Sequence, residues 1–314
     1  MTETQKSLAL HFGLLALLFA LQFILPAYHH GNLSRIMVLA TYAIGYNLLF
    51  GYTGLLSLGH AMFFAAGMYG MGLMIRHLGF TPAPALLIGV LAGLALSAAV
   101  GALALRTTGV AFMIVTLMFA QAGYLIILYF GEWTRGDEGF VIQQVQRSLW
   151  GIDLSDPTAR YFAAWMLFSA CLALSLWLIR HPFGRTLIAI RENESRAQML
   201  GYDVFRHKLG AVVLSGTISA AAGAAYALLF GYAGASFATV QYSILPLLWV
   251  LLGGAGTLIG PFLGTLFTFY LIDIASAFTT AYMLVVGIVL VALTLFARQG
   301  IGGEIRARLW NWLP

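Results

Sequence analysis

The stretch MLVVGIVLVALTLFA, residues 283–297, carries no charged side chain and is apolar on every face. A strand of a transmembrane β-barrel alternates apolar and polar side chains, so this stretch does not fit a barrel. A helix that crosses the hydrocarbon core of a bilayer needs roughly 20 mainly apolar residues, which this stretch and its neighbours supply. The stretch therefore predicts an all-α, polytopic helical membrane protein.

The rest of the chain repeats this pattern. Hydrophobic residues make up 61% of the 314 positions and charged residues only 9%, and the mean hydropathy is +0.90. We expect a single transmembrane domain, residues 1–314, with about 8–10 membrane helices including broken segments. The candidate segments lie near residues 8–26, 35–50, 57–76, 83–105, 109–130, 160–179, 208–231, 243–259, 261–278 and 280–297.

Two of these segments run into glycine-containing breaks, FGYTGLLSLGH at 50–60 and LLGGAGTLIGPFLG at 251–264. Irregular backbone at membrane depth is tolerated only where protein or a water-filled cavity covers it. The breaks are therefore candidates for a translocation path. Their candidate residues are Ser57, Gly59, His60, Gly253, Gly254 and Gly256.

The first apolar run, Leu8 to Leu25, has the start of either a signal peptide or a first membrane helix. It is long for a signal peptide, and LPAYHH after it offers no small-x-small cleavage site. We therefore expect a retained membrane helix. The single cysteine, Cys171, excludes a disulfide within the chain.

The distribution of charge predicts the topology, because cytoplasmic loops are enriched in Lys and Arg. The connection 180–208 contains six basic residues, and Arg298, Arg306 and Arg308 follow the last segment. The connection 131–159 holds five acidic residues and two arginines, which favours the external side. We expect a cytoplasmic loop at 180–208, an external loop at 131–159 and both termini in the cytoplasm. Topology also accounts for the pI near 9.4, so nucleic acid is not an expected partner.

The motifs of ATP hydrolysis and of several hydrolases are missing. Lys6 and Lys208 are the only lysines and neither follows a glycine, so no P-loop is present. No HExxH or GxSxG occurs. Ser57 and His60 share a helix face and raise the alternative of an intramembrane serine hydrolase, but no oxyanion hole is visible, and we expect no enzyme.

Two ionisable residues within the apolar segments keep alternatives open. Asp273 raises the possibility of ion coupling, although carriers usually need several such groups, and a structural contact with a helix end or a hydroxyl is favoured. His60 is either a pore residue or a packing residue. Glycines spaced four apart, at 256, 260 and 264 and at 89 and 93, predict faces where helices pack closely.

RENESRAQMLGYD, residues 191–203, puts five charged side chains into thirteen positions. Apolar residues at helical spacing predict one amphipathic helix from Arg185 to Leu200, with a Glu192–Arg196 pair on its polar face. Gly201 suits the left-handed residue that ends a helix, and Asp203 can cap the next one. The helix is either solvated, or bound to lipid headgroups, or bound to a protein. Mixed acids and bases favour a protein over headgroups. The apolar face would comprise Leu187, Ile190, Ala197 and Leu200.

Over nearly its whole length, the chain resembles the LivM-like permease subunits of branched-chain amino acid ABC importers. The similar segments follow the family's order: GYTGLLSLGHAMFFAAGMYG (51–70), LRTTGVAFMIVTLMFAQ (105–121), TRGDEGF (134–140), FGRTLIAIRENESRAQMLGYDVFRHKL (183–209) with LSGTISAAAGAAYA (214–227), and VLLGGAGTLIGPFLG (250–264).

This resemblance implies a type II importer fold in a bacterial or archaeal cytoplasmic (inner) membrane. It implies a heterodimer with a second, LivH-like permease, surrounded by lipid. Two cytoplasmic ATPase subunits would hold ATP and Mg, with no cofactor in this chain, and a periplasmic or extracellular binding protein would deliver the solute. Residues 191–202 then resemble the coupling helix that contacts the ATPase. The coupling residues would be Arg191, Glu192, Asn193, Glu194, Arg196, Gly201 and Tyr202.

The resemblance is less complete outside the membrane and for the substrate. The candidate contact for the external binding protein comprises Arg135, Asp137 and Glu138. The family commonly has a second glycine and a small or neutral residue at these positions. The expected solute is a branched-chain or related amino acid. Family members also carry urea, amides and aromatic carboxylates, and an ion-coupled secondary transporter stays open as an alternative.

Overall fold

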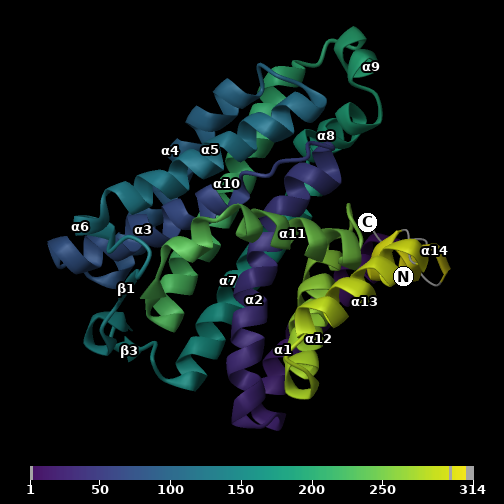
Figure 1. Cartoon of the computed structure of the whole chain (residues 1–314). Coiled ribbons are helices and arrows are strands. Elements are labelled where there is room, and N and C mark those ends of the chain that lie inside the picture. The colour runs from purple at the N-terminus through teal and green to yellow at the C-terminus, as the bar shows by residue number, and fades with distance from the viewer. Residues whose placement is uncertain (1–2, 297–298, 309–314) are drawn as a thin grey trace.

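The computed structural model describes residues 3–296 and 299–308, which form a bundle of helices (Figure 1). Arg298, one of the basic residues used for the topology, lies outside this part of the chain. The long helices are α1 (Glu3–Ile24), α2 (Ala27–Asn47), α3 (His60–Leu78), α4 (Pro82–Ala104), α5 (Gly109–Tyr129), α7 (Pro157–Arg180), α10 (Val204–Phe230), α11 (Val240–Gly253), α12 (Gly260–Phe278) and α13 (Tyr282–Phe296).

Each of the ten predicted apolar segments coincides with one of these helices. By length and composition, seven of the described helices could cross a membrane: α1, α2 with its extension, α4, α5, α7, α10 and α12. The other three are the mostly buried α3 and the shorter apolar helices α11 and α13. The predicted helical membrane fold is confirmed.

The core surrounds α2, α3 and α10. In the most apolar stretch of each helix, 83% of the α2 residues and 72% of the α10 residues are buried, against 22% for α1 and 17% for α5. Helices α3 and α10 pack so closely that a Cβ at Gly67 would overlap the Ala220 carbonyl, and one at Gly223 would overlap that of Phe64. The outer helices therefore present their apolar side chains to lipid or to another protein.

Most of the glycines spaced four apart pack helices within this chain, as predicted, but Gly256 lies in the second break with φ of 75° and belongs to no helix face. Gly93 of α4 leaves no room for a Cβ beside Ala220, and Gly89 lies against the Gly67 carbonyl. Gly264 of α12 lies directly against the Trp249 carbonyl of α11. These glycine faces are occupied by neighbouring helices of the same chain.

The two glycine-containing breaks are real, although their bounds differ from the prediction. The helix expected to start at 35 starts at Ala27 and continues as a π-helix, η1 (Leu48–Tyr52), and the helix expected from 57 starts only at His60. The helix expected to reach 259 ends at Gly253. Gly54, Gly254 and Gly256 have φ of 76°, 111° and 75°, which other residues rarely adopt, so the helices cannot continue through them.

Short elements close the two ends of the bundle. Segment 131–159 contains α6 (Gly131–Thr134), β1 (Phe140–Val141), η2 (Gln144–Arg147), β2 (Ser148–Leu149) and β3 (Ile152–Asp153). Strand β1 pairs with β4 (Tyr232–Ala233), which follows α10, and η3 (Ala235–Ala238) comes next. Helices α8 (Pro182–Glu192) and α9 (Glu194–Met199) precede α10 and lie at the other end of the bundle (Figure 1). The last helix is α14 (Gly300–Arg308). The connections 131–159 and 180–208 therefore lie at opposite ends of the bundle (Figure 1).

Candidate functional site

The charged segment before α10 is two helices rather than one. Asn193 has extended backbone, with φ −158° and ψ 102°, and its side chain accepts a hydrogen bond from the Arg196 amide at 2.8 Å. Asparagine favours such a capping position because its short side chain replaces the missing partner of a first-turn amide. The prediction of a continuous helix from Arg185 to Leu200 is wrong. Since Asn193 separates them, Glu192 and Arg196 share no helical face and form no ion pair in the described structure.

The buried face of this segment is shorter than predicted. Leu187, Ile190 and Ala197 are buried, but Leu200 is 72% exposed and Met199 is 81% exposed. The break at Asn193 turns the last residues of α9 away from the face that α8 buries. Two large apolar side chains are therefore displayed at the tip of a connection outside the helices that could cross a membrane.

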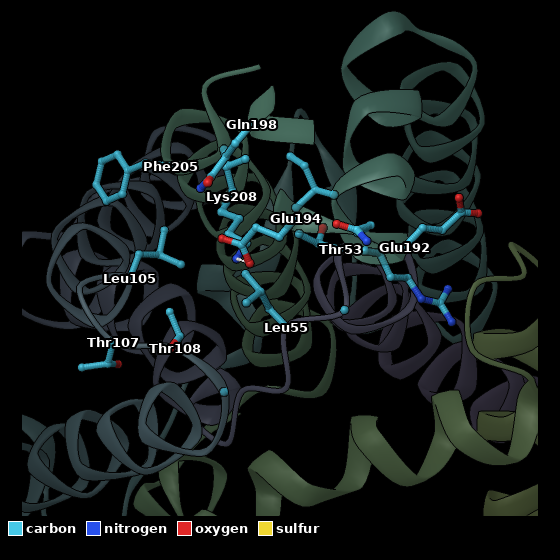
Figure 2. A pocket seen from close by; sticks show the side chains of 16 residues that line it. Thr53, Leu55, Leu105, Thr107, Thr108, Glu192, Glu194, Gln198, Phe205 and Lys208 are labelled. Carbon is cyan, nitrogen blue, oxygen red and sulfur yellow. Dashed lines mark hydrogen bonds and ion pairs between the residues drawn. The ribbon is translucent and has the colours of Figure 1, made fainter. Parts of the chain in front are cut away.

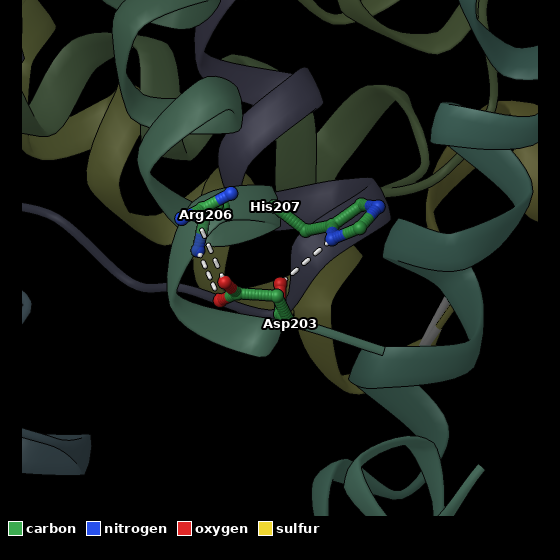
Figure 3. Close-up of polar contacts among 3 residues, drawn as sticks. All are labelled: Asp203, Arg206 and His207. Atoms are coloured by element: carbon green, nitrogen blue, oxygen red, sulfur yellow. Dashed lines mark hydrogen bonds and ion pairs between the residues drawn. The ribbon is translucent and has the colours of Figure 1, made fainter. Parts of the chain in front are cut away.

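The return into α10 follows the prediction. Gly201 has φ 86°, and the Asp203 carboxylate caps α10 by accepting the Arg206 amide at 3.0 Å. Asp203 also pairs with the Arg206 guanidinium at 3.0 Å, and its carbonyl oxygen lies 2.7 Å from Nδ1 of His207 (Figure 3). This turn fixes the direction in which α9 meets α10.

A pocket of about 340 Å³ lies beneath α9 (Figure 2). It is bounded by α8 and α9, by the start of α10, by the turn between α4 and α5, and by residues 53–55 of the first break. Within it Lys208 Nζ pairs with the Glu194 carboxylate at 2.6 Å, and the Lys208 side chain is only 12% exposed. Glu194 therefore holds α9 onto α10.

Arg191 connects this segment to the first break. Its guanidinium Nη1 donates a hydrogen bond to the carbonyl oxygen of Gly51 in η1. A Cβ on Gly54 would lie 3.1 Å from Cγ of Arg191, and one on Gly256 would lie 3.0 Å from Nη1. The Arg191 side chain thus lies against both breaks, which places the second break beside the first.

Asn47 joins the two breaks directly. Its amide nitrogen donates to the Thr257 carbonyl at 2.9 Å, and its side-chain oxygen accepts from the Gly256 amide at 3.0 Å. Asn47 is 2% exposed, so both bonds are shielded from water. Sequence reasoning missed Asn47, although a buried amide one residue before η1 is the kind of group that must find partners.

The candidate path residues of the first break are covered by protein. His60 is fully buried, with Nε2 2.7 Å from Oγ of Ser215, whose hydroxyl donates to the Gly45 carbonyl at 2.5 Å. Ser57 is also buried, and its hydroxyl oxygen accepts the Gly59 amide at 3.2 Å. The partner of His60 is thus Ser215, which contradicts the Ser57–His60 arrangement of a serine hydrolase.

The second break is covered to a similar extent. Gly253 and Gly254 are buried, and Gly256 is half-buried between Asn47 and Arg191. The structure therefore brings the two breaks together where Gly51 lies against Gly256, whereas the described contacts of Gly59 and His60 are with Thr116 and Ser215. Residues 53–55 of the first break line the 340 Å³ pocket, whereas five of the six candidate path residues are buried and Gly256 is half-buried.

Asp273 has the structural contact that the sequence favoured. The Tyr28 hydroxyl lies 2.8 Å from each carboxylate oxygen, and the neighbouring Tyr270 hydroxyl is 3.1 Å from Nδ1 of His29. These contacts join the start of α2 to α12.

The candidate receptor contact is on the far side from α9. Arg135, Asp137 and Glu138 are all exposed, and Arg135 and Glu138 line a pocket of about 390 Å³ with Arg76. Sequence reasoning used Arg147 only as a charge for the topology. In the structure it holds segment 131–159 to the end of α10, because its guanidinium donates to the Leu228 and Leu229 carbonyls at 3.0 and 2.8 Å. Burial lowers the pKa of Arg147, but these carbonyls at the end of α10 suit a cation.

A bundle of apolar helices with a charged connection at one end defines a polytopic membrane protein. Comparison with known sequences gives its family: residues 30–294 match the family model described as the permease component of branched-chain amino acid transport systems, and the chain belongs to this family.

The individual relatives are also permease proteins of transport systems. The chain is 28% identical to the high-affinity branched-chain amino acid transport system permease protein LivM of Escherichia coli, over 87% of this chain and 69% of the relative. It is 36% identical to a probable LivM of Methanocaldococcus jannaschii, over 33% and 31%. It is also 34% identical to the autoinducer 2 import system permease protein LsrC of Klebsiella pneumoniae, over 33% and 31%. No solved structure gives a significant match.

Proposed function

We propose that this chain is the membrane-spanning permease subunit of an ATP-binding cassette importer for a branched-chain or related amino acid. It forms half of the translocation path with a second, LivH-like permease. Two cytoplasmic ATPase subunits supply the energy, and a periplasmic or extracellular binding protein supplies the solute. The family match over residues 30–294 carries this proposal.

The segment of α8 and α9 is the proposed site of coupling to the ATPase. Exposed apolar side chains outside a membrane commonly mark a protein contact, and Met199, Leu200 and Tyr202 are 81%, 72% and 45% exposed. Glu192 and Arg196 are exposed beside them. The loop 180–208 and both termini then lie in the cytoplasm.

The opposite end of the bundle is the proposed docking face for the binding protein. Arg135, Asp137 and Glu138 are exposed there, and pairing of β1 with β4 holds their loop beside the end of α10. Charged side chains of both signs suit a partner that must dock in one orientation and then leave.

The two breaks are proposed to line the path in another conformation, because freed backbone groups at membrane depth need water or protein as partners. Single cysteines at Ser57 or Ala255, in a Cys171→Ser background, should react with a water-soluble thiol reagent during ATP turnover. Uniform protection in every nucleotide state would contradict this role.

The proposed class is tested by co-expression with candidate ATPase, second-permease and binding-protein genes from the same genome. Recovery of a complex whose ATPase activity rises with loaded binding protein supports the proposal. The partial match to LsrC keeps a second solute class, that of autoinducer 2, as a competitor in the uptake assay, together with urea, amides and aromatic carboxylates.

A further inference from the structure

Two charged residues of the α8–α9 segment face the permease itself. Glu194 pairs with Lys208 of α10, and Arg191 donates to the Gly51 carbonyl of η1. The Arg191 side chain makes this contact while remaining exposed, and Arg196, Met199 and Leu200 are exposed on the same segment without a described contact to the helix breaks. The segment therefore displays apolar and charged groups at its tip and is joined to the permease by two ionic or charge-assisted contacts.

The Arg191 contact reaches the place where both helix breaks meet. Gly51 lies in the last turn of the helix formed by α2 and η1, where carbonyl groups lose their helical partners and the helix dipole is negative. A guanidinium is well placed there, because it remains charged and can contact several oxygens at once. Gly256, in the second break, approaches the same guanidinium.

Asn47 ties the two breaks together by hydrogen bonds. It is bonded to both the Gly256 amide and the Thr257 carbonyl and is buried. A displacement of Arg191 that pulls on Gly51 therefore acts on the loop 254–259 as well. Arg191 belongs to the last turn of α8, whose buried residues Leu187 and Ile190 fix the position of this helix. The Arg191 side chain therefore links α8 to the two breaks.

We propose that Arg191 is a positioning residue that transmits movement of the α8–α9 segment to the two helix breaks, rather than a contact with the ATPase. This inference rests on the proposed importer function. It assigns the outer contact to the tip of α9 and the inner transmission to Arg191 with Gly51, Asn47 and Gly256. Loss of Arg191 leaves the ATPase bound and hydrolysing while the breaks no longer follow it.

The test compares Arg191→Met with wild type in the complete complex, in nanodiscs for ATPase activity and in proteoliposomes for uptake. Arg191→Lys retains a charge but not the guanidinium fork. Arg185→Met is the matched control, because Arg185 is an exposed arginine of the same helix and outside the proposed connection. The readouts are recovery of the ATPase with the permease, ATP hydrolysed, and solute transported per ATP.

We expect Arg191→Met to keep complex recovery and hydrolysis near wild type while transport per ATP falls about tenfold or more, the range of a typical coupling free energy. Arg191→Lys should fall in between, and Arg185→Met should match wild type. Lower complex recovery for Arg191→Met would assign the residue to the ATPase surface and overturn the inference. Unchanged transport per ATP would overturn it as well.

A distance measurement separates transmission from a merely structural role. Spin labels at Ser195→Cys and Ala255→Cys, in a Cys171→Ser background, report on α9 and the second break. We expect their separation to stay constant between nucleotide-free and ATP-bound complexes, and to change with nucleotide in Arg191→Met. If the separation behaves identically with and without Arg191, the inference is wrong. If the wild-type chain forms no complex with an ATPase, the proposed function itself fails.

Discussion

The guanidinium of Arg191 and the carbonyl oxygen of Gly51, 140 positions apart in the chain, are joined by a hydrogen bond. One partner belongs to the charged connection that precedes α10, and the other to the π-helix that ends α2. This contact shows that the charged side chains of residues 191–203 do not all serve to bind a partner. Arg191 and Glu194 hold the connection against the permease, and Glu192 and Arg196 are exposed beside them.

Reversing one member of the Glu194–Lys208 pair should loosen α9. Glu194→Lys places two cations together where Lys208 is only 12% exposed, and we expect a loss of about 1–2 kcal/mol in the local stability of α9. Hydrogen exchange of the α9 amides measures this effect. The double variant Glu194→Lys with Lys208→Glu should restore protection, and failure to restore it would show that the pair does not hold the segment.

Leu200→Asp should weaken binding of the ATPase. Burying a leucine that is 72% exposed in the free chain stabilises a contact by roughly 1.5–3 kcal/mol, so the variant should raise the Kd about tenfold or more. Binding of purified ATPase to the permease in nanodiscs measures the change. Val145→Asp, a comparably exposed apolar residue of segment 131–159, should leave the Kd unchanged. Equal effects of both variants would argue against the α9 tip as the contact.

Gly201→Val should impair coupling through backbone geometry alone. Gly201 has φ 86° and a Cβ there would meet no atom within 4 Å, so the cost is conformational, about 1–3 kcal/mol. Gly201→Asn should be tolerated better, because asparagine enters the left-handed region more readily. ATPase stimulation by loaded binding protein is the measurement. Equal activity of the Val and Asn variants would mean that this turn does not position α9.

Asp273→Asn should retain most transport. The asparagine oxygen can still accept the Tyr28 hydroxyl, which lies 2.8 Å from both carboxylate oxygens, so the connection between α2 and α12 survives. Initial uptake rates at matched expression measure this. Complete loss of transport would instead indicate that the negative charge takes part in ion or proton movement.

The helical membrane architecture could be predicted because a long, uninterrupted apolar composition leaves few alternatives. The breaks could be predicted because they contain glycines, and Gly54, Gly254 and Gly256 adopt positive φ values that interrupt a helix. The caps at Gly201 and Asp203 were also predictable, since they depend on neighbours in the sequence. The break at Asn193 was not, because a periodic pattern continues through it. The partners of Arg191, Glu194 and Asn47 come from other helices, and local sequence carries no information about which helices meet there.

The central claim is tested most directly by uptake of labelled leucine, isoleucine or valine into proteoliposomes. The liposomes contain this chain, the second permease and the ATPase subunits, with binding protein added outside and ATP enclosed. We predict accumulation that requires both ATP and binding protein and that stops when the ATPase is omitted. Uptake by this chain alone, driven by an ion gradient without any ATPase, would contradict the account.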